Sequence, residues 1–425
     1  MNSMDPGGAI HPKCGSVVSL RSKPSKRLVY LCDWLPPDFG AVGQYAMLEA
    51  REWANRGFAV TLVGLTSGAS SRGSAEAIGE GSLEIVRVHR RKYQKQRFVE
   101  RLIWTILSNL VLLRAAFSAM RAADLVLFTG SPPLMLHFIA PLNVLLRRRL
   151  IYRIMDFHPE CLIAERGKSG LLLTVLLQLT YFWRRRIDAF EVLGQDQAQR
   201  LREIGIADSR VEIKPLPSLV AFPPGLAPLA LPEELHGGSG VILYSGNWGV
   251  AHDESTFVEA YARYVVSSSN PLRLWINATG AKADRVEREL GARGVPFFRS
   301  HLVSLDQLPS LLIAVDVHLV TLRDSFVGYV LPSKIHACIE SGKRILFIGS
   351  QTSDVHRLAA TSLSADRYRR VDVGDVEGVV RALRSLEENL TVERRSDVSR
   401  ADEAKSKLAA GPVVEARPAI ENAIR

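Results

Sequence analysis

The chain has 425 residues, of which 47% are hydrophobic and 23% charged, and its formal net charge is +10 at pH 7. This length predicts two domains, and the apolar content is sufficient for two ordinary cores. The positive charge favours an anionic partner: a membrane surface, a nucleotide or a nucleic acid. Nucleic acid is disfavoured because only 7% of the residues are aromatic and none alternate with basic residues.

The four cysteines have no C-x-x-C spacing, so the sequence indicates neither a zinc site nor a disulfide framework, and a reducing cytoplasm fits. The ten histidines are scattered, so no metal cluster is predicted. The first 27 residues are polar and rich in Gly, Ser and Lys, and we expect a flexible tail rather than a secretory signal.

The N-terminal half begins with a short apolar run, residues 28–32, which predicts a buried parallel strand. A loop containing Gly40 and Gly43 then opens a helix over residues 42–56, and a second strand covers 58–63. Ligands of doubly wound sheets bind at the carboxyl ends of strands, where this loop lies, and glycine allows close backbone approach. The spacing is not G-x-G-x-x-G, and a tight turn without a ligand is the alternative interpretation.

Two apolar helices in this half are flanked by basic residues. A basic run at 89–97 precedes a helix over 98–120, and a second helix at 171–183 is followed by Arg184-Arg185-Arg186. The first is interrupted by arginine and the second is too short, so neither predicts a membrane span with certainty. The pattern suits helices that lie on anionic lipid, while two core helices are the alternative.

The strand at residues 150–155 is followed directly by Asp156-Phe157-His158-Pro159-Glu160. A carboxylate or imidazole at this edge can act as a general base on an acceptor hydroxyl, so Asp156 and His158 are the candidate catalytic residues. A helix-capping Asp156 with an incidental His158 is the alternative. The N-terminal domain is predicted over 28–215 and ends within the segment 211–217.

Residues 216–240 are rich in Pro, Leu, Ala and Gly, which indicates a linker. A second domain is predicted over 241–390, followed by a partly helical tail at 391–425. Its first strand runs into a glycine loop containing Gly246 and Asn247. Because both halves begin with a strand, a glycine loop and a helix, the sequence predicts an α/β protein with two doubly wound parallel-sheet domains.

The most informative stretch lies at residues 324–349. A strand leads into a loop with Gly328, and a short helix then starts at Ser333, a good N-cap, and ends at Gly342. Lys334 occupies the first turn, where a cation opposes the helix dipole unless an anion lies in front of it. The stretch therefore predicts a phosphate site, and a βαβ unit without a ligand is the alternative.

Together, four segments resemble the GT-B glycosyltransferases, in particular the family 4 group that builds bacterial exopolysaccharide and lipopolysaccharide. These segments are PPDFGAVGQY, MDFHPE, SGNWGVAHD and PSKIHACIESGKRILFIG. The resemblance covers about residues 28–375. It implies two Rossmann-like domains facing across a cleft, a nucleotide-diphosphate-sugar donor bound by the C-terminal domain, and an acceptor on the N-terminal domain. It also implies a retaining reaction without a metal or cofactor.

By position, the resemblance assigns Gly40 and Gly43 to the cleft. It assigns the donor site to residues of the second domain: Gly246, Asn247, Gly328, Ser333, Lys334 and Glu340. Two departures stand out. Ala337 occupies the place of a common ribose-binding glutamate, with Glu340 one turn later, and His252 is the sole candidate before Arg263 for a basic residue after the SGN segment.

We therefore expect a glycosyltransferase that acts on a lipid-linked or polysaccharide acceptor. Its expected location is the cytoplasmic face of the cell membrane, bound peripherally to anionic lipid. A nucleotide-sugar 2-epimerase of the same fold is one alternative, and a catalytically silent partner in a polysaccharide complex is another.

Overall fold

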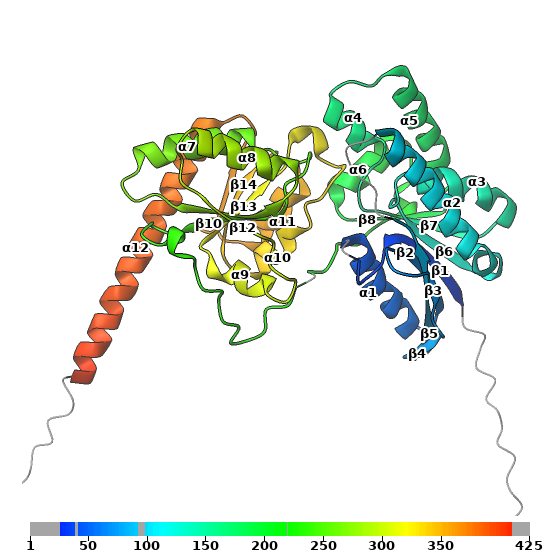
Figure 1. The fold of residues 1–425 in the computed structure, drawn as a ribbon, viewed down its shortest axis with the longest axis horizontal. Helices are drawn as coiled ribbons and strands as arrows, with labels where there is room; N and C mark the ends of the chain where they lie inside the picture. The colour runs from blue at the N-terminus through cyan, green and yellow to red at the C-terminus, as the bar shows by residue number, and fades with distance from the viewer. Residues whose placement is uncertain (1–25, 39–40, 92–97, 219, 410–425) are drawn as a thin grey trace, which may run out of the picture.

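The computed structural model describes residues 26–38, 41–91, 98–218 and 220–409, with side chains described up to residue 396 except at Ala41, Phe98, Val99 and Ala281. Two α/β units are visible, each built on its own sheet (Figure 1). The strands coincide with continuous apolar runs, because a parallel strand covered by helices on both faces of its sheet buries side chains on both sides.

The first sheet runs in the order β3-β5-β2-β1-β6-β7-β8-β9, with β4 paired to β5. Among the described residues its pairings are parallel, except that β3 and β4 run antiparallel to β5. The strands are β1 (Arg27–Trp34), β2 (Ala59–Thr66), β3 (Ser71–Arg72), β4 (Glu76–Ile78), β5 (Gly81–His89), β6 (Leu125–Thr129), β7 (Arg149–Ile154), β8 (Ala189–Val192) and β9 (Val211–Ile213).

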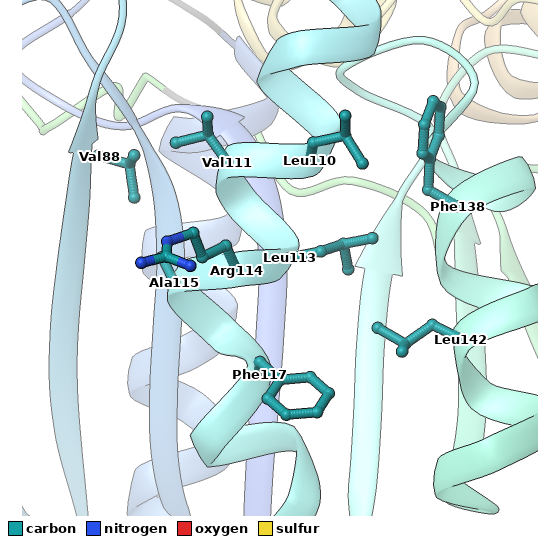
Figure 2. A pocket seen from close by; sticks show the side chains of 9 residues that line it. All are labelled: Val88, Leu110, Val111, Leu113, Arg114, Ala115, Phe117, Phe138 and Leu142. Atoms are coloured by element: carbon teal, nitrogen blue, oxygen red, sulfur yellow. The ribbon is translucent and has the colours of Figure 1, made fainter.

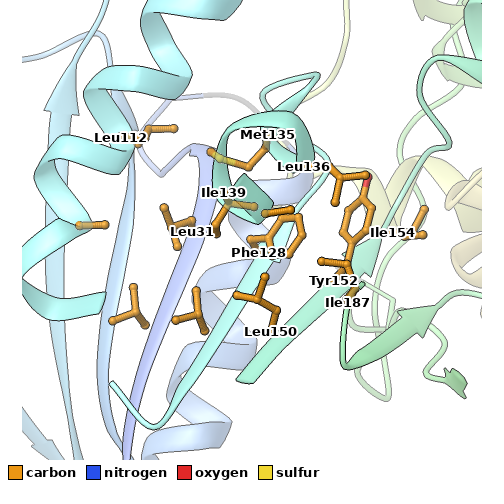
Figure 3. Close-up of a cluster of buried hydrophobic side chains, with 14 of the residues drawn as sticks. Leu31, Leu112, Phe128, Met135, Leu136, Ile139, Leu150, Tyr152, Ile154 and Ile187 are labelled. Carbon is orange, nitrogen blue, oxygen red and sulfur yellow. The ribbon is translucent and has the colours of Figure 1, made fainter. Parts of the chain in front are cut away.

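The helices of this unit are α1 (Ala41–Asn55), α2 (Phe98–Ala122), α3 (Met135–Leu146), α4 (Glu160–Arg166), α5 (Leu171–Arg184) and α6 (Gln195–Glu203). Side chains of β1 alternate between the two faces of the sheet, as the strand period requires. Leu28 and Tyr30 pack with the α1 side, whereas Val29 and Leu31 pack with α2 and α3. Figure 3 shows the second cluster, in which Leu31 lies close to residues of both helices.

The second sheet has the order β12-β11-β10-β13-β14-β15, and its described pairings are all parallel. Its strands are β10 (Val241–Asn247), β11 (Arg273–Thr279), β12 (Phe298–Ser300), β13 (Val317–Thr321), β14 (Arg344–Ile348) and β15 (Tyr368–Val371). The helices are α7 (Ser255–Ser267), α8 (Ala281–Ala292), α9 (Leu308–Ala314), α10 (Lys334–Glu340), α11 (Asp354–Ser362) and α12 (Val376–Ala409). The order reverses at β10, so ligands are expected beyond its carboxyl end.

The linker and the C-terminal tail differ from the sequence-based expectation. The linker packs on the second unit, because the backbone N–H of Leu229 donates to the Ser310 carbonyl at 3.0 Å and Val220 is buried beside α9. The boundary predicted at residue 391 falls inside α12, which continues without a break to Ala409 and extends away from its unit (Figure 1).

The two units meet through the carboxyl ends of their strands. One buried cluster combines Met155 and Leu193, which follow β7 and β8, with Phe326 and Leu331, which follow β13. This packing brings together the loops that the sequence marks as functional.

Candidate functional site

The glycine loop of the second unit begins at the carboxyl end of β10. Gly246 has a φ of +106°, a conformation that other residues rarely adopt, and no atom lies within 4 Å of the position that a Cβ would occupy. Asn247 is exposed, and the Trp248 backbone N–H anchors the loop by donating to the Thr279 carbonyl at 2.8 Å. A ligand can therefore approach the backbone at Gly246 and Asn247.

Lys334 lies next to this loop, against an aromatic ring of β10. Its Nζ is 3.3 Å from the centre of the Tyr244 ring, and Trp248 stacks on that ring at 3.6 Å. Lys334 and Trp248 are both too close to the Tyr244 ring to lie on the same face of it, so the ring lies between these two side chains. The buried Nζ makes no hydrogen bond to the described protein, and burial lowers the pKa of Lys334 to about 7.

His252, the candidate for a basic residue after the SGN segment, does not carry a positive charge. Burial, and then the charge of Lys334, lower its pKa to about 3, and its Nδ1 lies 2.6 Å from the Thr321 carbonyl. The neutral ring thus donates to that carbonyl. Lys282, which sequence reasoning missed, lies nearby: its Nζ donates to the His252 carbonyl and to Glu254, each at 2.6 Å.

The remaining donor candidates occupy different places. Ser333 precedes α10, but its backbone is helical and its side chain makes no capping bond, so the predicted cap is wrong. Glu340 is exposed, and six residues place it about 120° around the helix from Lys334. Burial raises the pKa of Tyr45 on α1 to about 12, and the Glu340 carboxylate makes a smaller upward contribution.

Gly328 lies at the interface between the units rather than beside Lys334. Its φ is +79°, and a Cβ there would lie 2.8 Å from Nε of Arg200 and 2.9 Å from the Asp196 carbonyl. This glycine lets the loop after β13 approach α6 closely.

The loop after β7 touches the same interface. The backbone N–H of Phe157 donates to the Tyr329 carbonyl at 3.0 Å, so the Asp156–His158 and Gly328 loops are brought together. Burial lowers the pKa of the His158 imidazole, which favours its neutral form, and the charge of Asp156 opposes this shift. Partial loss of hydration raises the pKa of Asp156, although this residue still reaches solvent.

Glu160, the last residue of that segment, has a structural contact. It forms a buried ion pair with Arg184 of α5, whose Nη2 also donates to the His158 carbonyl at 3.2 Å. The guanidinium further lies over the Phe157 ring, 4.8 Å from its centre. Arg184 therefore fixes the backbone that presents His158.

Sequence reasoning also missed Asp33 at the carboxyl end of β1. Its Oδ2 accepts a hydrogen bond from Ser131 Oγ at 2.5 Å, and its buried Oδ1 has no partner in the described structure. Burial raises the pKa of Asp33 to about 6. Since β1, β6 and β7 are neighbours, this carboxyl shares its sheet edge with Asp156.

Of the two cleft glycines, Gly40 lies outside the described residues. A Cβ on Gly43 would lie 1.8 Å from the Trp34 carbonyl oxygen. Gly43 thus lets the start of α1 pack directly on the end of β1, a packing requirement that the glycine-loop interpretation did not anticipate.

Neither a protein-family model nor a curated protein sequence matches this chain. Among solved structures, HepE from Anabaena in complex with UDP is similar over 91% of this chain and all of its own, with 11% identity and a TM-score of 0.53. The trehalose 6-phosphate synthase of Burkholderia multivorans is similar over 93% of this chain and all of its own, with 12% identity and a TM-score of 0.54. These likenesses, with two parallel sheets whose carboxyl edges face one another, show that the chain has the GT-B fold of two Rossmann-like domains.

Proposed function

We propose that this chain is a glycosyltransferase that uses a nucleotide-diphosphate-sugar donor and a lipid-linked or polysaccharide acceptor. The observation that carries the proposal is Lys334, whose buried ammonium has no hydrogen-bond acceptor among the described residues and lies next to the open loop at Gly246. An unpaired buried cation is costly unless an anion accompanies it in the working state. Solved structures of the similar protein HepE contain UDP and UDP-glucose, which supports a nucleotide-sugar donor.

In the proposed reaction the acceptor hydroxyl oxygen bonds to the anomeric carbon while the bond from that carbon to the diphosphate breaks. Charge then develops on the leaving diphosphate. Lys334 turns from the Tyr244 ring to neutralise it, and backbone N–H groups of the Gly246 loop assist. Because these groups supply the positive charge, we propose that transfer needs no metal, and we keep the retaining stereochemistry implied by the resemblance.

The acceptor side of the proposal rests on the first domain. The neutral His158 imidazole can accept the hydroxyl proton, and Asp156 and Asp33 can orient acceptor hydroxyls from neighbouring strand ends. The interface contact between Phe157 and Tyr329 keeps this edge opposite the donor domain.

A membrane location is proposed from the surface of the first domain. By length and composition, α2 could cross a membrane between Glu100 and Ala122, but one side of it lies in the core. Its other side exposes a stripe of apolar residues at helical spacing: Ile103, Ile106, Leu107, Leu110 and Phe117. We propose that α2 lies on the inner membrane surface rather than spanning it.

A shallow groove of about 730 Å³ continues this stripe toward α3. Figure 2 shows Leu110 and Phe117 of α2 and Phe138 of α3 around it, with Arg114 among them. Apolar side chains beside an arginine match the acyl and phosphate parts of an anionic lipid. This surface supports the lipid-linked class of acceptor.

The first test is calorimetric binding of UDP, GDP, ADP and CDP to wild type, Lys334→Ala and Lys168→Ala. We expect one nucleotide to bind selectively, with affinity falling at least tenfold in Lys334→Ala. Lys168 is an exposed lysine on the first domain, and its variant should bind as wild type does. Equal binding by Lys334→Ala would contradict the donor assignment. In a separate assay with the nucleotide sugar, a product formed without any acceptor would indicate an epimerase.

A further inference from the structure

Two aspartates from different domains face each other where α6 and α11 begin. The backbone N–H of Asp196 donates to Asp354 Oδ2 at 2.8 Å, and the backbone N–H of Asp354 donates to Asp196 Oδ2 at 3.1 Å. Each carboxyl group therefore caps the helix of the other domain. Both residues are buried, with 7% and 4% of their surfaces exposed.

The surrounding backbone is shaped for this contact. A Cβ on Gly194 would lie 1.9 Å from Asp354 Oδ2 and 2.7 Å from its Cγ, so any larger residue would displace the Asp354 carboxyl group from this contact. Close by, Arg200 Nη2 donates to the Val327 carbonyl at 2.9 Å. The pair thus belongs to the contact that holds the domains together.

The charges around the pair do not balance two carboxylates. Asp354 Oδ1 pairs with Arg357 at 2.9 Å, and Asp196 Oδ1 accepts from the Gln197 backbone N–H at 2.7 Å. The other charged or titratable side chains of these helices have partners elsewhere: Arg200 with Glu203 and the Tyr329 ring, Arg202 with Asp208, and His356 with Tyr368. One half-exposed guanidinium is the counter-charge that the described residues supply.

We propose that Asp196 and Asp354 form a proton-dependent latch between the two domains. With one proton shared, the carboxyl groups hydrogen-bond and the helices stay docked. When that proton is lost, two buried carboxylates are in contact, and their repulsion and desolvation favour separation.

The direction of the pH dependence follows from the proton count. Burial and the neighbouring Asp354 raise the pKa of Asp196 from 3.8 to about 7 in the docked state. Between about pH 4 and 7 the docked form therefore keeps a proton that the separated domains have already released. The docking equilibrium should weaken by up to about tenfold per pH unit in that range and level off above it.

This inference goes beyond the proposed function, because it concerns domain docking and needs no substrate. If the function is as proposed, the latch would control access to the cleft between donor and acceptor sides. Its test can therefore fail while nucleotide binding succeeds, and the reverse is equally possible.

The experiment is fluorescence energy transfer between dyes on Lys168→Cys and Glu388→Cys, one exposed position in each domain, in the full chain with Cys14→Ser. The described cysteines are buried in the docked protein, so the dyes are attached at pH 5.5, where the proposal keeps the domains docked. Without nucleotide, wild type should show high transfer at pH 5.5 and lower transfer at pH 8.5.

Asp354→Asn keeps an oxygen for the Asp196 N–H and adds a neutral donor, so transfer should stay high at both pH values. Asp196→Asn is the equivalent variant in the other domain and serves if the first does not fold. Gly194→Ala should lower transfer at both pH values, whereas Gly291→Ala, where a Cβ meets no atom within 4 Å, should match wild type. The proposal is overturned if wild-type transfer does not change with pH, or if the asparagine variants keep the wild-type change.

Discussion

The buried ammonium of Lys334 lies 3.3 Å from the centre of the Tyr244 ring, on the face opposite Trp248, and finds no hydrogen-bond acceptor in the part of the chain that the structure describes. The ring contact offsets part of the lost hydration, but not all of it, since the pKa falls to about 7. A site with this property should take up a proton when an anion binds.

The first prediction is proton uptake by Lys334 on nucleoside diphosphate binding. Above pH 7 the ligand-free side chain is increasingly neutral, and a bound diphosphate restores its charge. Affinity should therefore fall by up to about tenfold per unit from pH 7 to 9. Calorimetry at pH 8 in Tris and in HEPES should give binding heats that differ by the buffer contribution of up to about one proton.

The same shift has the opposite consequence for stability. Because the folded-state pKa of Lys334 lies below its ordinary value of 10.5, the ligand-free protein loses stability from this group as pH falls from about 10.5 to 7. At pH 7 the free energy of unfolding of Lys334→Met should be about 1 kcal/mol higher than that of wild type, as measured by urea denaturation. Equal heats of nucleotide binding in Tris and HEPES would contradict proton uptake by Lys334. Equal stability of Lys334→Met and wild type would contradict the cost of burying the ammonium.

The second prediction concerns Asp33, whose pKa in the folded protein is raised from 3.8 to about 6. The folded state holds the proton more tightly, so the stability contributed by protonated Asp33 is lost as pH rises through this window. Asp33→Asn removes the ionisation and should gain up to about 3 kcal/mol over wild type at pH 8 relative to pH 4. Urea denaturation at both pH values measures this, with the exposed Asp208→Asn as control.

The third prediction is that Glu160 is required for folding stability rather than for chemistry. Glu160→Gln would leave the buried Arg184 without its counter-charge, at a cost of about 3–5 kcal/mol. Urea denaturation should show this loss, while the exposed Glu165→Gln should change stability by less than about 0.5 kcal/mol. A loss below about 1 kcal/mol in Glu160→Gln would mean that the pair is not formed in solution.

The fourth prediction tests the membrane surface on α2. Wild type should sediment with vesicles of phosphatidylcholine and phosphatidylglycerol, and less with phosphatidylcholine alone, because the surface combines apolar and basic residues. Ile103→Asp with Leu107→Asp should reduce partitioning at least tenfold, since both side chains are exposed.

Val266→Asp is the matched control, because this apolar residue is 87% exposed but lies on α7 of the second domain. It should bind vesicles as wild type does. An equal loss in the control would show that binding depends on overall charge, and no loss in the α2 variant would exclude this face.

The sequence by itself determined the fold class, because apolar runs that alternate with glycine loops and helices are typical of parallel strands in a doubly wound sheet. It also placed Gly246 and Asp156 in loops at the carboxyl ends of strands, as the structure does, whereas their roles stay predictions. Short-range patterns suffice for these conclusions, because strand, loop and helix are consecutive in the chain.

Only the tertiary structure decided which polar groups are paired. Asp196 and Asp354 are 158 residues apart, and no local pattern relates them. Folding likewise paired Glu160 with Arg184, placed Gly328 at the domain interface and left Lys334 with no acceptor among the described residues. Electrostatic contacts in a low-dielectric interior depend on distance in space, which the order of residues does not specify.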